Sequence, residues 1–528
     1  MHDRDAATRR QQIPIADLLV RAEQHRIAGR LAEASASCRG ILEAQPGEPN
    51  ATHLLGLIAH QSGKLGEAIE HLRRAVKLAP DAPLYHANLG EMCRLAGRID
   101  DAVKHGRRAV KLKPDYPEAL SNLGAALYER KAYAEAADCH RRAVALNPGF
   151  ALAHSNLGNA LHAMKRFDEA VDAYRQAIAI EPGFADAWSN LGTSLHHGGD
   201  FDDGLAALRH AVALAPGHAN AHSGLGILLL MRGDFAEGLD EYEWRLRSGE
   251  RKGRHFLEHP WHGDNLTGRH IYLEAEQGFG DTLQFARYLP LLTARGAAVS
   301  IRVQQPLVTL LRDSLPGIDV LGDRGEPSRA VDCDCALLSL PRLLRTRLET
   351  IPASARYLRA PPEAVSGWRQ RLESMRGLRA GLVWAGNPEH SNDVRRSLDL
   401  AALAPLLAVP GVSFASLQVG PRAADLRKSR VAADIIDLSA RLTDFAESAA
   451  AIEQLDLVVT VDTSVAHLAG GLGKPTWLLL PWVTDWRWLL GREDNPWYPT
   501  MRLFRQPAIG DWESVIRRVA GELGNFGT

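Results

Sequence analysis

Residues 151–184 read ALAHSNLGNALHAMKRFDEAVDAYRQAIAIEPGF, and this stretch decides the fold of the first half of the chain. Gly158 and Ala170 are small residues at points where two antiparallel helices approach each other closely. Pro182 closes the second helix, because proline cannot continue a helical hydrogen-bond ladder. The stretch therefore predicts one pair of packed helices.

The same pattern recurs along the chain with a step of 34 residues. Leu-Gly pairs stand at Leu55-Gly56, Leu89-Gly90, Leu123-Gly124, Leu157-Gly158, Leu191-Gly192 and Leu225-Gly226. Prolines stand at Pro46, Pro80, Pro114, Pro148, Pro182 and Pro216, and small residues at Ala34, Ala68, Ala102, Ala136, Ala170, Gly204 and Gly238. One helical pair cannot bury its apolar face alone, so the pairs stack into a superhelix with a concave groove. We expect an α-solenoid over residues 14–247, and its pattern resembles the tetratricopeptide repeat.

An asparagine ladder occupies one position of successive repeats, two residues before the glycine: Asn88, Asn122, Asn156 and Asn190. One interpretation is repeat consensus. The other is that the amides line the groove and hydrogen-bond a peptide backbone whatever its sequence. The layout resembles the animal O-GlcNAc transferase, in which such a ladder holds protein substrates, so the resemblance implies a protein or peptide acceptor here.

Beyond Arg247 the periodicity ends, and residues 248–268, beginning with the charged segment Ser248–His255, are interpreted as a linker. Apolar runs then alternate with amphipathic stretches, as in parallel sheets with crossover helices. A stretch rich in proline and charge, Ala360–Glu363, divides this region into residues 269–362 and 363–528. We expect strands at His270–Glu274, Ala298–Val303, Ala336–Leu340, Ala380–Trp384, Ser413–Leu417, Leu457–Thr460 and Thr476–Leu480. We expect helices at Thr282–Arg295, Leu400–Leu407, Asp444–Gln454 and Asp511–Leu523.

Ligands of such sheets bind at the carboxyl ends of the strands, so the loops that follow strands are the candidate sites. The first loop runs from Glu276 to Asp281, and its glycines permit close approach of a substrate. Asp281 has two interpretations: it stabilises the start of the next helix, or it acts in chemistry. The loop lacks G-x-G-x-x-G spacing, which disfavours a nicotinamide site.

Two further loops carry groups suited to phosphate. Val383–Pro388, with Asn387, leads to Arg395 and Arg396, whose guanidinium forks suit a diphosphate; the alternative is a solvated turn. Val461–Gly470 opens a helix whose free N–H groups favour the same ligand. Asp462 is expected to cap backbone amides, and His467, one turn into the helix, to donate to an anion.

Residues 270–480 resemble the bacterial heptosyltransferase family of inverting GT-B glycosyltransferases. The most specific feature is Ala469–Pro475 together with the motif before it. The resemblance implies two Rossmann-like sub-domains and a donor-phosphate site at Asp462, Thr463, Ser464 and His467, although Ser464 stands where a glycine is usual. Gly280 and Asp281 fall on the family's Gly-Asp, whose carboxylate is the proposed general base, and Arg396 lies near the phosphate-binding lysine.

A closer match is to bacterial repeat proteins that carry this transferase-like region, through Gln277–Tyr288, Trp384–Ser397 and Asp485–Pro499. In GT-B folds a final helix such as Asp511–Leu523 often crosses back to the first sub-domain. The tryptophan-rich segment Trp482–Trp497 is expected to pack between the sub-domains, with a sugar-facing role for Trp486 or Arg487 as the alternative.

The mechanism implied is one inverting displacement, with Asp281 as the catalytic base. Gly280, Asn387, Arg395, Arg396, Asp462, Thr463, Ser464 and His467 would bind the donor. The donor is a nucleotide-diphosphate sugar, with no further cofactor and no metal. Two alternatives remain open: transfer to a glycan or lipid-linked saccharide, with the repeats only docking partners, and a non-catalytic scaffold with a degenerate transferase domain.

Asp332-Cys333-Asp334 spells the D-x-D of metal-dependent glycosyltransferases, but it precedes the apolar run Ala336–Leu340 rather than following one. Metal binding there is disfavoured, and Cys333-x-Cys335 lacks the second thiol pair of a zinc site.

Composition excludes several classes of protein. Lys plus Arg is 62 against 63 for Asp plus Glu, which argues against a nucleic-acid-binding surface. The first residues lack the apolar core of a signal peptide, and the apolar run around Thr476–Trp482 is too short to span a bilayer. Five cysteines form no even framework, which is typical of a reducing compartment. We therefore expect a cytoplasmic protein.

Overall fold

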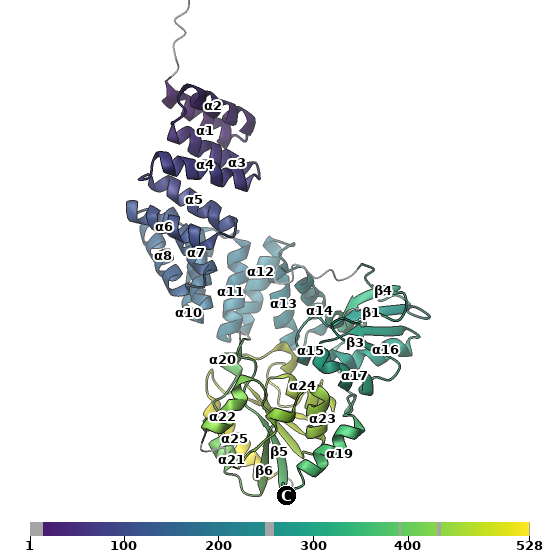
Figure 1. Ribbon diagram of the computed structural model, residues 1–528. Coiled ribbons are helices and arrows are strands. Elements are labelled where there is room, and N and C mark those ends of the chain that lie inside the picture. Colours follow the sequence, from purple (N-terminus) through teal and green to yellow (C-terminus); the bar gives the residue numbers. More distant parts are fainter. Residues whose placement is uncertain (1–13, 249–257, 390–391, 430–433, 527–528) are drawn as a thin grey trace, which may run out of the picture. The chain divides into compact units, whose positions relative to one another are not determined.

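The computed structural model describes residues 14–248, 258–389, 392–429 and 434–526. The chain divides into two compact units, residues 1–198 and 199–528. The first unit is helical, and the second contains the last repeat helices and two parallel sheets (Figure 1). The repeat pattern thus continues past the boundary between the units.

Antiparallel helices form the repeats in both units. Those of the first unit are α1 Ile15–Ile27, α2 Leu31–Ala44, α3 Pro49–Gln61, α4 Leu65–Leu78, α5 Pro83–Leu95, α6 Ile99–Leu112, α7 Pro117–Glu129, α8 Tyr133–Leu146, α9 Ala151–Ala163, α10 Phe167–Ile180 and α11 Ala185–Gly198. The second unit continues with α12 Phe201–Leu214, α13 Ala219–Arg232, α14 Phe235–Tyr242 and the 3-10 turn η1 Glu243–Leu246. No helix in the described part of the chain is both long and apolar enough to cross a membrane.

The glycine ladder marks the points where paired helices touch. A Cβ on Gly158 would lie 2.6 Å from the Tyr174 ring, and one on Gly124 would lie 2.6 Å from His140. At Gly226 the obstacle is backbone, since a Cβ there would lie 2.4 Å from the Tyr242 nitrogen. Glycine is therefore required where the second helix crosses the first, as the sequence pattern predicts.

The first sheet has the strand order β3-β2-β1-β4, all parallel. Its strands are β1 His270–Glu274, β2 Ala298–Arg302, β3 Asp319–Leu321 and β4 Cys333–Ala336. Its helices are α15 Phe279–Phe285, α16 Leu289–Ala294, α17 Val308–Ser314 and α18 Leu340–Leu343. The expected strand at Ala336–Leu340 is wrong: the strand ends at Ala336, and the apolar run turns into helix. The helix after β1 begins at Phe279, three residues before the expected start.

The second sheet has the order β10-β9-β8-β5-β6-β7, again parallel. Its strands are β5 Leu378–Val383, β6 Val412–Ser416, β7 Ile436–Asp437, β8 Leu457–Val461, β9 Thr476–Leu480 and β10 Met501–Arg505. Its helices are α19 Pro362–Arg371, α20 Asp393–Arg396, α21 Ala404–Leu407, α22 Asp425–Lys428, α23 Phe445–Glu453, α24 Ser464–Gly471 and α25 Trp512–Leu523. Read along the chain from β5, this is the Rossmann order, and the strand order reverses between β5 and β8.

The last helix, α25, stays with its own sheet. Val515, Ile516, Val519 and Leu523 join one buried apolar cluster with residues of β5, β8 and β9. The expectation that this helix returns to the first sub-domain is therefore not met, because its apolar face is already covered by the second sheet.

The linker expected at residues 248–268 is only partly described, since residues 249–257 lie outside the described ranges. The part that follows is packed. His259 N–H donates to the Asp334 carboxylate at 3.0 Å, and Trp261 is buried with its N–H on the Asp334 carbonyl at 2.8 Å. Residues 258–268 therefore extend the first sub-domain along β4.

Substituting Gly226 by alanine should destabilise the second unit by about 1–3 kcal/mol, the usual cost of overpacking. The Cβ meets the Tyr242 backbone, which cannot move away as a flexible side chain could. Gly217→Ala is the control, because nothing lies within 4 Å of its Cβ, and it should change stability by less than about 0.5 kcal/mol. Urea unfolding of both variants measures the difference; equal stabilities would contradict this account of the ladder.

Candidate functional site

A buried arginine from the repeats occupies the point where strand order reverses in the first sheet. The Arg245 Nε and Nη2 groups donate to Glu276 Oε1, in the loop after β1, at 2.8 and 2.6 Å. Nη2 also donates to Ser339, which follows β4, at 2.9 Å. Arg245 is 4% exposed, and the Glu276 side chain is fully buried. This position is therefore filled by protein, and the candidate site lies further along the β1 loop.

Asp281 accepts hydrogen bonds on both carboxylate oxygens. Gly278 N–H donates to Oδ2 at 2.9 Å, and Arg487 Nη2 donates to Oδ1. Arg487, in the 3-10 turn η11 Trp486–Trp488, also donates to Asp485 at 2.8 Å. Burial alone would lower the pKa of Arg487, but attraction to Asp281 and Asp485 outweighs it and raises that pKa. The helix-start interpretation of Asp281 is confirmed, and its role as a base stays a prediction.

The loop after β1 touches the helix after β8 at Gly280. A Cβ on Gly280 would lie 2.7 Å from His467 Cδ2, so only glycine fits between α15 and α24. His467 is 6% exposed, stacks on Trp488 with ring centroids 5.0 Å apart, and has Nδ1 2.9 Å from the Tyr498 hydroxyl. Burial and then the nearby Arg487 charge lower the pKa of His467 to about 3. Its imidazole is thus neutral near pH 7 and would meet an anion only as a neutral N–H donor.

Thr463, not Asp462, caps the helix after β8. Its hydroxyl accepts from Val465 N–H at 3.3 Å, and Ser464 is the first residue of α24. The expectation that Asp462 caps these amides is therefore wrong. Burial and then repulsion from Asp485 raise the pKa of Asp462 to about 6, against the opposing charge of Arg396.

The loop after β5 presents Arg396 on a tight backbone. A Cβ on Gly386 would lie 2.4 Å from Asp393 Oδ1 and 2.8 Å from Arg396 Nη2, so glycine is needed beneath the guanidinium. Arg396 Nε lies 3.5 Å from Asp393, and it is buried with no hydrogen-bond partner among the described residues. Arg396 thus retains hydrogen-bonding capacity at the point where strand order reverses.

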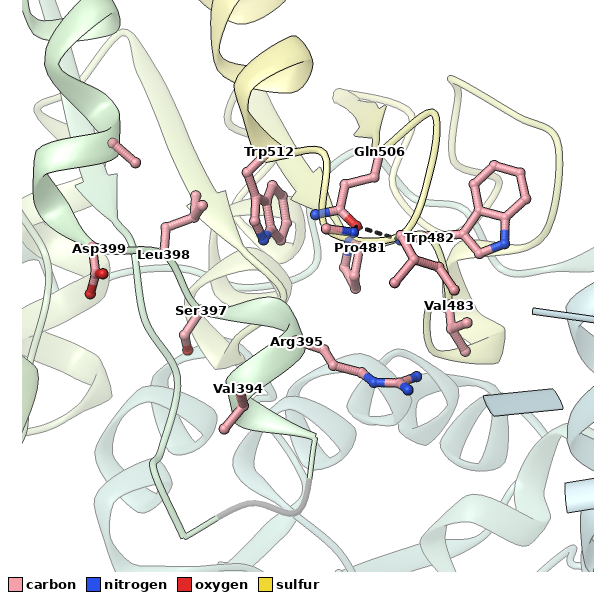
Figure 2. Close-up of a pocket in the computed structure, with 13 residues that line it drawn as sticks. Val394, Arg395, Ser397, Leu398, Asp399, Pro481, Trp482, Val483, Gln506 and Trp512 are labelled. Atoms are coloured by element: carbon pink, nitrogen blue, oxygen red, sulfur yellow. Dashed lines mark hydrogen bonds between the residues drawn. The ribbon is translucent and has the colours of Figure 1, made fainter. Parts of the chain in front are cut away.

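The structure brings most of the predicted site residues together. Gly280 and Asp281 meet the β8 loop through His467 and Arg487, and Arg396 lies within electrostatic range of Asp462 and His467. Asn387 does not join them: it is exposed and its side chain accepts from Glu389 N–H in a local turn. Arg395 lines a separate cavity (Figure 2).

Sequence reasoning missed three site residues: Asp485, Tyr498, and Arg487 as the partner of Asp281. All three lie in Asp485–Pro499, a segment already singled out by its resemblance, and that was the available signal. Periodicity gives no sign of them because the segment is mostly irregular.

The asparagine ladder lies in the first unit, and its four side chains are half-buried. Asn88 Nδ2 lies 2.8 Å from His53 Nε2, and Asn190 donates to Asn159 at 3.1 Å. Among the described residues no side-chain hydrogen bond involves Asn122 or Asn156. Two rungs are therefore held inside the repeats, and two retain free amide groups.

The D-x-D carboxylates take structural bonds. Asp332 accepts from His270 N–H at 2.7 Å, and Asp334 accepts from His259 N–H at 3.0 Å. Within the described ranges, no group of three or more His, Cys, Asp or Glu side chains is arranged to hold a metal ion.

Comparison with protein families identifies the helical pairs. Tetratricopeptide repeat models match residues 13–83, 53–117, 151–184 and 189–247, and a TPR repeat model matches residues 124–165. The N-terminal helical pairs are therefore tetratricopeptide repeats.

One curated relative is Protein FlbA of Caulobacter vibrioides, 31% identical over 291 residues, or 50% of this chain and 48% of FlbA. The chain thus spans about half the length of this relative. Among solved structures, the APC/C hetero-tetramer Cut9-Hcn1 is 19% identical over 42% of this chain and 44% of that chain, with a TM-score of 0.38. MamA is 27% identical over 30% of this chain and 94% of that chain, with a TM-score of 0.29. TM-scores this low do not define the overall fold.

As pH rises from about 4 to about 6, the raised pKa of Asp462 should lower the free energy of unfolding. In this range the folded protein binds a proton that the unfolded chain releases. Asp462→Asn removes this effect. Its free energy of unfolding relative to wild type should rise by about 1–3 kcal/mol from pH 4 to pH 7. Urea titrations across this range measure the difference. Asp399→Asn, at a side chain 91% exposed, is the control, and an Asp462→Asn difference as flat as that of the control would contradict the raised pKa.

Proposed function

We propose that the protein is a metal-independent, inverting glycosyltransferase that moves a sugar from a nucleoside-diphosphate donor to a protein bound by the repeats. The observation that carries the proposal is the convergence of Asp281, Arg396 and the start of α24 beside two Rossmann-like sheets. A carboxylate, a guanidinium and a helix N-terminus are the groups that such a transfer needs.

The diphosphate would bind where strand order reverses in the second sheet. Arg396 offers a guanidinium whose Nε, 3.5 Å from Asp393, makes no hydrogen bond among the described residues, and the first N–H groups of α24 offer partial positive charge. An anion beside Asp462 favours the protonated carboxyl, which its raised pKa already makes accessible near neutral pH. All three groups therefore suit a diphosphate without a metal ion.

In the proposed reaction Asp281 accepts the proton of an acceptor hydroxyl while that oxygen attacks the anomeric carbon. The bond from that carbon to the diphosphate oxygen breaks, and the departing charge is stabilised by Arg396, the start of α24 and the neutral N–H of His467. Gly278 N–H and Arg487 Nη2 donate to the two oxygens of the Asp281 carboxylate and so fix its orientation.

Asp281→Asn tests this chemistry. The amide should bind donor normally while transfer from a panel of nucleotide sugars to proteins of a cell extract falls by about 10²–10⁴-fold. Intact mass spectrometry and calorimetry measure the two effects, and Asp313→Asn, an exposed aspartate of α17, is the control. Near-normal turnover would leave Asp281 as a helix-start residue.

Activity lost in excess chelator and restored by Mn²⁺ or Mg²⁺ would overturn metal independence.

The protein acceptor is tested at the rungs that retain free amides. Asn122→Ala with Asn156→Ala should weaken acceptor binding by about 5- to 150-fold, from two net hydrogen bonds. Donor hydrolysis without acceptor should persist, which separates acceptor binding from catalysis. Unchanged protein transfer would make the ladder repeat consensus and favour the glycan or lipid-linked acceptor instead.

A further inference from the structure

A cavity of about 400 Å³ opens at the carboxyl ends of β5, β9 and β10 (Figure 2). Its walls are mostly apolar, including Leu398, Pro481, Val483, Ile509 and Trp512. This volume and lining are those of a small-molecule site, in which a few polar groups set orientation.

Gln506 is the polar side chain that distinguishes this cavity. It follows β10, is 3% exposed, and its Oε1 accepts from Trp482 N–H and Gly510 N–H, both at 3.1 Å. Its Nε2 is buried and has no hydrogen-bond partner among the described residues. Because the oxygen is already engaged, the amide can serve a ligand only as a donor.

The cavity adjoins the proposed diphosphate site through the short helix α20. Arg395 lines the cavity, whereas Arg396, the next residue, lies above Gly386. Ser397 lines the cavity too, and its hydroxyl accepts from Gly386 N–H at 2.9 Å and donates to Asp393 at 2.8 Å. A ligand with phosphates at Arg396 therefore needs to pass only one helical turn to reach the cavity.

The corresponding glutamine on the other side of β5 has no spare group. Gln418, after β6, accepts from Trp384 and Ala385 N–H groups, and its Nε2 donates to the Ala385 and Val419 carbonyls. Of these two buried glutamines beside the β5 loop, only Gln506 retains an unused donor.

We propose that this cavity binds the nucleobase of the donor, with the base against the apolar walls and Gln506 Nε2 donating to a carbonyl at C4 of a pyrimidine or at C6 of a purine. The proposal rests on the proposed function in that the donor is a nucleotide sugar. The Gln506 amide can only donate, so it pairs with the carbonyl of uracil or guanine. Cytosine and adenine carry an amino group at the corresponding position, which would face the Gln506 amide donor to donor. The site thus selects uridine over cytidine diphosphate donors, or guanosine over adenosine diphosphate donors.

The test compares UDP with CDP, and GDP with ADP, on the full chain, so that ring size is matched within each pair. Calorimetry, or quenching of Trp482 and Trp512 fluorescence, measures affinity. The carbonyl member of at least one pair should bind about ten-fold or more tightly than its partner. Gln506→Glu keeps an oxygen for Trp482 and Gly510 but replaces the donor by an acceptor. It should weaken the preferred nucleotide by about ten-fold and abolish the preference.

Gln454→Glu is the matched control, another buried glutamine that does not line the cavity. Arg396→Ala should weaken all four nucleotides alike. If Arg396→Ala has that effect while Gln506→Glu changes nothing, the base does not bind here, although the proposed function stands. If none of the four binds, the proposed function fails as well. If Gln506→Glu does not fold, two other results test the proposal: the wild-type preference for UDP over CDP or GDP over ADP, and a ten-fold loss of nucleotide affinity in Trp512→Leu. A preference for CDP and ADP overturns the proposal.

Discussion

The buried guanidinium of Arg487 is the interaction on which the arrangement of the second unit depends. It is 5% exposed and bonds to Asp281 of the first sub-domain and Asp485 of its own. An arginine buried this deeply is tolerated only when carboxylates compensate it, and here two carboxylates do so. Its guanidinium also lies 4.6 Å from the centre of the Trp486 ring, which packs with Phe285 and Trp497. Charge pairing and aromatic packing therefore hold the β1 loop against η11.

A second buried arginine sets the geometry around His467. Arg287 donates to the Trp497 carbonyl and to the Tyr357 hydroxyl at 3.1 Å, and it lies 4.5 Å from the centre of the Tyr498 ring. Tyr498 in turn pairs with His467. The orientation and neutral state of the histidine are thus determined before a ligand binds, which is the preorganisation that electrostatic stabilisation of a leaving group requires.

Some strands of the second unit could be predicted from the sequence, and others could not. β1 and β9 have the predicted bounds and β8 ends one residue later than predicted, and the loops after β1, β5 and β8 carry the predicted catalytic and donor-binding residues. β3 and β7 have only three and two residues and show no alternation that a pattern could reveal. β4 was not predicted because it contains the polar Asp334, whose Oδ2 accepts from His259 N–H, a partner far away in sequence.

The sequence by itself determined the repeats, since a period of 34 residues records contacts between near neighbours in the chain. It also determined which loops follow parallel strands, because strand and helix periodicity are local properties. Only the tertiary structure decided that Asp281 pairs with Arg487, that Gly280 lies against His467, and that Gln506 has one engaged and one unused group. The first two contacts join residues about two hundred positions apart, and the third depends on what surrounds a buried amide. Neither distance in space nor hydrogen-bond satisfaction leaves a periodic trace in the chain.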